Sequence, residues 1–168
     1  IGTDSLTGIE RVRGGGGDDV LVGDDGDNRL FGGSGDDTLT GGAGNDRLVG
    51  NAGIDTVDYS GSNSSVNVNL AQGSASGNDV GSDTLRSIEN VIGGSGDDVI
   101  TGTSGDNRIL AGDGDDTLFG GGGTDLLSGG SGNDLYVASA GSITIETGGG
   151  ADQLKLLGSL TSVSSVDV

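Results

Sequence analysis

Acidic residues recur in this sequence at a fixed spacing. Residues 14–58 divide into five units of nine residues, and residues 93–137 divide into five more. In each unit the fourth residue is Gly, the sixth is Asp or Asn, and the eighth is Leu, Ile, Val or Tyr. Carboxylate and amide oxygens are the ligands that hard divalent cations prefer. The spacing therefore indicates cation binding by an array of side chains.

The composition excludes most other chemistry. The chain has 168 residues with no Cys and no His, and its 26 Asp and Glu against 7 Lys and Arg give a net charge of −19. Zinc sites, disulfides and His-dependent catalysis are therefore excluded, and the charge argues against nucleic acid as a partner. Paired carboxylates could hydrolyse glycosides, but the repeat register already accounts for them. We expect no enzyme activity here, and any catalysis in a separate domain of the parent protein.

The same units predict the elements that would position these oxygens. Three residues around the eighth position can form a short strand with one side chain pointing inward. The six Gly-rich residues before them can form a tight turn. Two units would make a flattened coil of 18 residues, and stacked coils would pair their strands in parallel. The predicted fold is all-β, a parallel β-roll with two thin core columns of Leu, Ile and Val.

Stacking would bring the sixth residues of alternate units together. Unneutralised carboxylates at this spacing repel each other, and so thin a core cannot offset the ordering entropy of this much Gly. A divalent cation between stacked turns would remove the repulsion, and calcium fits an all-oxygen donor set. The predicted columns are Asp19–Asp37–Asp55, Glu10–Asn28–Asp46, Asp98–Asp116–Asp134–Asp152 and Glu89–Asn107–Asp125.

A longer duplication overlies the nine-residue repeat. The stretch from Asp4 matches the stretch from Asp83, an offset of 79 residues. We predict a first block over residues 1–58, an irregular connecting segment over 59–83 with a strand at 66–70, and a second block over 84–168. The blocks could form one roll or two. The second would end in a C-terminal cap or in the start of an export signal, and because the chain begins at Ile1 we expect a fragment of a longer protein.

The tandem pattern GGxGxDxUx, in which U is a large apolar residue, resembles the RTX, or hemolysin-type, calcium-binding repeats of secreted bacterial toxins, proteases, lipases and alginate epimerases. The resemblance implies a right-handed parallel β-roll filled with calcium. Each ion would lie between stacked turns. It would take the carbonyls of positions 2 and 4 and the position-6 side chain from one turn, and the carbonyls of positions 1 and 3 and the position-6 side chain from the next.

Carried over residue by residue, this resemblance implies seven to nine calcium ions. The first block would supply three sites. The ligands of the first would be Gly15, Gly17, Asp19, Gly32, Ser34 and Asp37, and those of the second Gly33, Gly35, Asp37, Gly50, Ala52 and Asp55. Those of the third would be Asp24, Gly26, Asn28, Gly41, Ala43 and Asp46. The second block would supply four sites. Two of them would use Gly94, Gly96, Asp98, Ala111, Asp113 and Asp116, and Gly112, Gly114, Asp116, Gly129, Ser131 and Asp134, respectively. The other two would use Thr103, Gly105, Asn107, Gly120, Gly122 and Asp125, and Gly130, Gly132, Asp134, Thr147, Gly149 and Asp152, respectively. Two further sites would use Gly8, Glu10, Gly23 and Asp25 beside Asn28, and Ser87, Glu89, Gly102 and Ser104 beside Asn107.

The resemblance also implies a biological setting. The chain would stay unfolded at low calcium, pass through type I secretion machinery, and fold outside the cell or at its surface, where it stabilises an attached effector. No apolar run reaches the length of a membrane span, and no signal peptide is visible. A rigid segment of a surface-layer protein or adhesin is an alternative that the sequence leaves open.

Four of the basic residues fall on one predicted face. Arg11, Arg29 and Arg47 are 18 residues apart, and Arg13 lies beside them. Neighbouring arginines across strands destabilise a sheet unless anions compensate. The stripe could serve solubility, or it could bind an acidic polysaccharide. The segment DYSG…VNVNL…GxAxG…DTL…IEN is similar to intervals in accessory modules of secreted alginate epimerases, which favours the second interpretation.

Overall fold

A computed structural model describes residue 8 and residues 10–166, and in them it contains strands and no helix that could span a membrane. Residues 1–7 and 9 of the predicted first block and the last two residues of the chain lie outside this description. The strands are β1 (Arg11–Gly16), β2 (Val20–Val22), β3 (Arg29–Ser34), β4 (Thr38–Thr40), β5 (Arg47–Ala52), β6 (Thr56–Asp58), β7 (Val66–Asn69), β8 (Ser74–Gly77), β9 (Gly81–Arg86), β10 (Asn90–Ile92), β11 (Val99–Thr101), β12 (Arg108–Asp113), β13 (Thr117–Phe119), β14 (Thr124–Ser131), β15 (Leu135–Ala138), β16 (Ser142–Glu146), β17 (Gln153–Leu156) and β18 (Ser162–Val166).

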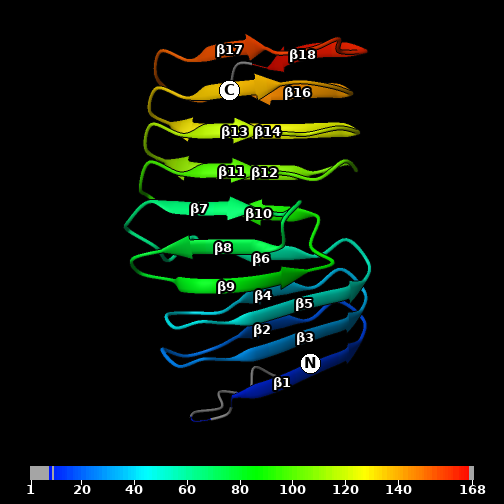
Figure 1. The fold of residues 1–168 in the computed structure, drawn as a ribbon, viewed down its shortest axis with the longest axis vertical. Coiled ribbons are helices and arrows are strands. Elements are labelled where there is room, and N and C mark those ends of the chain that lie inside the picture. Colours follow the sequence, from blue (N-terminus) through cyan, green and yellow to red (C-terminus); the bar gives the residue numbers. More distant parts are fainter. Residues whose placement is uncertain (1–7, 9, 167–168) are drawn as a thin grey trace.

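Two sheets face each other along the whole stack (Figure 1). The large sheet has ten strands in the order β1-β3-β5-β9-β8-β7-β11-β13-β15-β17, and the small sheet has eight in the order β18-β16-β14-β12-β10-β6-β4-β2. Arg11 pairs with Arg29 and Arg29 with Arg47, so successive coils are offset by 18 residues. The predicted parallel β-roll with 18 residues per coil is therefore confirmed, and it forms a solenoid of about nine turns.

The core is the pair of apolar columns that the eighth positions predict. Leu30 and Leu48 line the large sheet, Leu39 and Val57 line the small sheet, and all four are fully buried. The columns continue through the second block with Ile100, Leu118 and Tyr136 on one side and Val91, Ile109 and Leu127 on the other. Short repeat strands such as β4 contribute one inward apolar side chain each, so the core is long but only two residues thick.

The connecting segment is built into the large sheet. β7, β8 and β9 follow one another there, and the pairs β7–β8 and β8–β9 are antiparallel, unlike the other pairs. Val66, Val68 and Leu70 alternate inward and are buried. The two sheets continue past this insertion, because β9 pairs with β5 and β10 pairs with β6, both in parallel. The division into blocks at residues 58 and 83 stays a prediction.

The turns depend on glycine where coils touch. Gly35 has a φ of 120°, and a Cβ atom built on it would overlap the backbone of Gly17 in the coil before. Only glycine accepts both that φ and that approach without strain. The Gly-rich turns thus allow backbone to stack on backbone at the spacing of the sheet.

Candidate metal sites along two edges of the roll

The position-6 residues, here called the inner acids although two of them are Asn, form ladders along the two edges of the roll. The backbone N–H of Asp19 donates to Oδ1 of Asp37 over 2.9 Å, and the N–H of Asp37 donates to Oδ1 of Asp55 over 2.9 Å. The same bond recurs from Asp98 to Asp116 and from Asp116 to Asp134, at 2.7 and 3.0 Å. Asp37, Asp55, Asp116 and Asp134 therefore each use one oxygen to bind the coil before them.

The second oxygen of many inner acids has no partner. Among the residues that the structure describes, six buried carboxylate oxygens accept no hydrogen bond, and each is an Oδ2. Desolvating an ionised carboxylate without a partner costs several kcal/mol. Such atoms call for a positive charge next to them. They belong to Asp19, Asp37, Asp46, Asp55, Asp116 and Asp134.

These oxygens point into small spaces that position-1 glycines leave open. A Cβ atom on Gly14 would collide with Oδ2 of Asp19 and lie 2.6 Å from the carbonyl oxygen of Gly32. A Cβ atom on Gly93 would likewise meet Oδ2 of Asp98 and the carbonyl oxygen of Ala111. Carboxylate and carbonyl oxygens from two stacked turns therefore converge where a side chain is absent. That donor set fits a hard cation such as Ca²⁺.

Backbone oxygens are essential to these sites. In the described part of the chain no three acidic side chains gather closely enough to hold one ion among themselves. Two stacked turns offer at most two inner acids, whereas Ca²⁺ takes six to eight oxygens. Carbonyl groups or water must supply the others, in agreement with the ligand types that the sequence resemblance implies.

Burial sets the electrostatics of the inner acids. Desolvation raises the pKa of Asp116 to about 7 and those of Asp46 and Asp125 to about 6. It also raises the pKa of Asp55 and of Asp134, where neighbouring carboxylates add to the shift. A buried carboxylate beside others resists ionisation unless a cation compensates. Without a bound cation, the ionised form of the buried ladder is therefore disfavoured at neutral pH.

The two Asn-containing turns differ from the Asp turns. Oδ1 of Asn28 accepts the N–H of Asp24 over 2.7 Å, and its Nδ2 donates to the Asp24 side chain over 3.1 Å. Asn107 accepts from the N–H of Thr103 and donates to the carbonyl oxygen of Glu89. These amides are satisfied within the protein. The sites proposed for Glu10 with Asn28 and for Glu89 with Asn107 therefore have no orphaned oxygen on the Asn.

The structure connects the columns of the two blocks in a way that the repeat register did not predict. The small-sheet edge, meaning the turns that lead into strands of the small sheet, carries Asp19, Asp37, Asp55, Glu89, Asn107 and Asp125 in one unbroken series. The large-sheet edge carries Glu10, Asn28, Asp46 and Asp83, then an interruption at β8 and β7, then Asp98, Asp116, Asp134 and Asp152. Asp98 starts the second series, where it accepts the N–H of Val66.

Two sets of acids were not predicted as parts of the edges. Asp83 accepts the N–H of Asp46 and the hydroxyl of Tyr59, each over 2.8 Å. Residues 78–86 carry the signal that could have found it, because Gly81, Asp83 and Leu85 occupy positions 4, 6 and 8 of a nine-residue unit. The exposed acids at position 5 form an outer ladder, in which each accepts an N–H from the next coil. Its members are Asp18, Asp27, Asp36, Asp97, Asp106 and Asp115.

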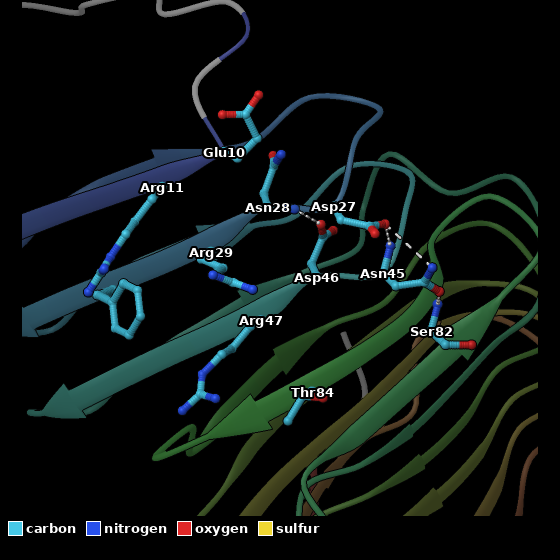
Figure 2. Close-up of a pocket in the computed structure, with 11 residues that line it drawn as sticks. Glu10, Arg11, Asp27, Asn28, Arg29, Asn45, Asp46, Arg47, Ser82 and Thr84 are labelled. Atoms are coloured by element: carbon cyan, nitrogen blue, oxygen red, sulfur yellow. Dashed lines mark hydrogen bonds between the residues drawn. The ribbon is translucent and has the colours of Figure 1, made fainter.

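The arginine stripe is a feature of the large sheet. Arg11, Arg29 and Arg47 are exposed and lie side by side on β1, β3 and β5 (Figure 2). Arg11 and Arg13 sit over the ring of Phe31, at 5.1 and 5.3 Å from its centroid. A groove of about 710 Å³ runs along the stripe, and its other lining residues include Glu10, Asp27, Asn28, Asn45, Asp46, Ser82 and Thr84.

Comparison with known families identifies the repeat from which this fold is built. The family model of the RTX calcium-binding nonapeptide repeat, which describes four copies of the unit, matches residues 4–39, 22–57, 92–127, 101–136 and 128–155. These matches cover more than half of the chain, so the protein belongs to the RTX calcium-binding repeat family. It is a structural calcium-binding module in which the repeats, rather than a catalytic centre, define the activity. The comparison with curated proteins found no match to the chain.

Proposed function

We propose that calcium binding folds this chain, and that the calcium-filled roll stabilises an effector attached to it in a secreted protein. The observation that carries this proposal is the set of six buried Oδ2 atoms without hydrogen-bond partners. Without a cation they oppose folding, because burial disfavours the charged carboxylate. With a cation between the turns they become ligands. Binding free energy is then folding free energy.

The residues of each turn have separate tasks in this mechanism. The inner acid accepts the ladder hydrogen bond with one oxygen and leaves the other for the ion, as Asp37 does. The position-1 glycine keeps the space open, and the carbonyl oxygen of the next turn faces it, as Gly14 and Gly32 show. Bound Ca²⁺ supplies positive charge that neutralises the carboxylates of two coils at once. We propose seven to nine ions for the full chain, with the six orphaned oxygens as the best supported positions.

Far-UV circular dichroism during a CaCl₂ titration tests calcium-driven folding directly. We expect a cooperative coil-to-β transition that MgCl₂ does not reproduce and that a chelator reverses, because Mg²⁺ loses its water reluctantly and demands stricter geometry. A chain that is already β-rich without calcium contradicts the proposal. The acid ladders would then need a different counter-charge.

Membership of this family also supports a proposal for how the chain is exported. We propose that the chain crosses type I secretion machinery unfolded, in the low calcium of the cytoplasm, and folds outside the cell or on its surface. RTX repeats are typical of secreted proteins. A fusion of the chain to a reporter, exported with an RTX-type secretion system, should appear outside the cell. Raising intracellular calcium before export should reduce its yield.

A second candidate function is binding of an acidic polysaccharide on the arginine stripe. It is favoured by the register of Arg11, Arg29 and Arg47, which places three cations on adjacent strands beside an open groove. Among the described residues none of these guanidinium groups forms an ion pair with a carboxylate, so their charge is available to an anion.

Charge reversal of the stripe tests this candidate. Arg29→Glu with Arg47→Glu should abolish retention on a polyuronate matrix in the presence of calcium. The matched control, Arg108→Glu with Lys155→Glu, removes the same charge from β12 and β17 and should be retained like the unmodified chain. Equal retention of both variants contradicts polysaccharide binding by the stripe.

A further inference from the structure

We propose that Asp55, Ser87 and Glu89 form an additional calcium site that joins the two blocks. The inference deepens the proposed function and rests on calcium binding by stacked turns. Ser87 and Glu89 lie outside every stretch that the family model matches. The repeat register ends the first block's column at Asp55 and does not pair it with Glu89. The site comes from the fold alone.

The unpartnered oxygen of Asp55 is the first observation. Asp55 is fully buried, and its Oδ2 has no hydrogen-bond partner. In the repeat sites such an oxygen faces the next turn along the same edge, as Oδ2 of Asp19 faces Gly32. The next turn after Asp55 on the small-sheet edge is the turn of Glu89. An ion at this oxygen would therefore lie between the two blocks.

The junction reproduces the arrangement of a repeat site. A Cβ atom on Gly50 would collide with Oδ2 of Asp55 and with the carbonyl oxygen of Ser87. The corresponding atom on Gly14 meets Oδ2 of Asp19 and the carbonyl oxygen of Gly32. The carbonyl oxygen of Ser87 thus occupies the place that the carbonyl oxygen of the position-1 residue, such as Gly32, occupies in a repeat site. Its φ of 50° is one of only two positive values among the described non-glycine residues, which marks a specially shaped turn.

The shape of this turn explains why the acid is Glu. Arg86 and Asn90 are four residues apart, whereas their paired residues, Val49 and Thr56, are seven apart. The turn is three residues shorter than a repeat turn. Glu has one more methylene than Asp, and Oε2 of Glu89 reaches the N–H of Asp55 over 2.9 Å, the same ladder bond that Asp makes elsewhere. The longer side chain restores the ladder across the shortened turn.

The backbone holds both halves of the site in place. The carbonyl oxygen of Asp55 accepts the N–H groups of Glu89 and Asn90, over 3.0 and 2.9 Å. On the other edge of the junction, both oxygens of Asp83 are occupied by the N–H of Asp46 and the hydroxyl of Tyr59. Oδ2 of Asp46 is unpartnered on that edge, but both oxygens of Asp83 that could face it already accept hydrogen bonds. The small-sheet edge is therefore the better candidate for an ion held by acids of both blocks.

Native mass spectrometry of the calcium-saturated full chain tests the site by counting ions. Glu89→Gln should bind at least one ion fewer than the unmodified chain. Glu146→Gln, which removes the same charge at the end of β16, should keep the full count. In an Asp55→Asn background, Glu89→Gln should lose one ion fewer than it loses alone, because the shared site is already gone. An equal loss with and without Asp55→Asn would place every ion of Glu89 elsewhere, as in the site beside Asn107, and overturn the proposal, as would an unchanged count in Glu89→Gln alone.

A second measurement avoids substitutions, in case a variant fails to fold. Crystals of the calcium-loaded chain should show an anomalous scattering peak bounded by Asp55, Ser87 and Glu89. Peaks in the repeat turns without one at the junction would refute the site. Neither experiment depends on calcium-driven folding. A chain that is β-rich without calcium would contradict calcium-driven folding, and the ion count would still decide whether the junction site exists.

Discussion

At the scale of the residue, the inner acids have two oxygens with different tasks. Asp37 shows both, since Oδ1 accepts the N–H of Asp19 and Oδ2 is buried without a partner. An Asn in the same place can make its own hydrogen bonds, as Asn28 does with Asp24. Asp and Asn differ in one side-chain atom, an oxygen in place of a nitrogen. That difference separates a buried carboxylate with an unpartnered oxygen from an amide whose oxygen and nitrogen are both hydrogen-bonded.

Replacing Asp37 by Asn should weaken calcium binding in two adjacent sites, because its carboxylate lies between the turns of Asp19 and Asp55. Each site lost costs about 2.7 kcal/mol when calcium is at one hundred times its Kd. Denaturation in excess calcium measures the loss. Asp36→Asn is the matched control, since Asp36 is exposed and only accepts the N–H of Ile54. Equal effects of the two substitutions would show that charge alone, and not position, matters.

The raised pKa of the inner acids predicts a pH dependence. Burial brings the pKa of Asp116 in the metal-free fold to about 7, above its ordinary value of 3.8. Protons therefore stabilise the metal-free fold as the pH falls from about 7, and that stability is lost as the pH rises. Calcium needs the ionised form, so protons compete with it. The calcium midpoint, measured by circular dichroism between about pH 8 and about pH 5, should rise as the pH falls; a constant midpoint would contradict the shift.

At the scale of the element, the roll is an alternation of short strands and glycine turns. Neither is stable alone, because a short strand such as β4 has one buried apolar side chain and the buried side chain of a turn is an inner acid. Stacking supplies the partners of both. Substitutions at the contact between coils should therefore act on folding as a whole.

Gly35→Ala should destabilise the calcium-loaded roll by about 1–3 kcal/mol, because the φ of 120° is strained for any other residue and the new Cβ meets the backbone of Gly17. Thermal unfolding in saturating calcium measures the change. Gly61→Ala is the control, since nothing lies within 4 Å of its Cβ position. A Gly35→Ala chain as stable as the control would argue that the coils can separate at no cost.

Truncating the core should be equally costly. Leu39→Ala removes a fully buried side chain from β4 and should lower the free energy of unfolding by about 2–5 kcal/mol. Val20→Ala is expected to change it little, because Val20 on β2 is 73 % exposed. Denaturant titrations at fixed calcium compare them. Similar losses in both variants would mean that the apolar columns are not the core.

The elements that could be predicted from the sequence are those with a regular period. Leu30, Leu39 and Leu48 recur every nine residues, and Asp19 and Asp37 meet because 18 residues separate them. The junction has no such period. Three antiparallel strands and a shortened turn change the offsets between coils to 37 and 34 residues, so the pairing of Asp55 with Glu89 depends on tertiary packing. The Tyr59 hydroxyl that closes Asp83 could not be inferred from spacing for the same reason.

At the scale of the whole molecule, the sheets join both blocks into one stack. β10 continues from β6 in the small sheet, and β9 continues from β5 in the large sheet. A net charge of −19 spread along this stack opposes compaction until cations bind. Folding of one block should therefore favour folding of its neighbour.

The two tyrosines can test this coupling, because Tyr59 is buried beside the junction and Tyr136 is buried in β15. In Tyr59→Phe and Tyr136→Phe chains the remaining tyrosine reports on one region. Its fluorescence during chelator titration should give the same calcium midpoint in both variants. Far-UV circular dichroism of each variant controls for a direct effect of the substitution. Separate midpoints would show two independently folding blocks.

We expect the interrupted ladder on the large-sheet edge to give the module a preferred direction of bending. On the small-sheet edge the inner acids follow one another from Asp19 to Asp125 without a gap. On the large-sheet edge they stop at Asp83 and resume at Asp98, where β8 and β7 widen the sheet. Ions clamped along the unbroken edge would resist extension, while the widened edge can compress or open. The roll would then bend mainly in one plane, with the small-sheet edge as its stiff side. A domain attached to either end would move in that same plane.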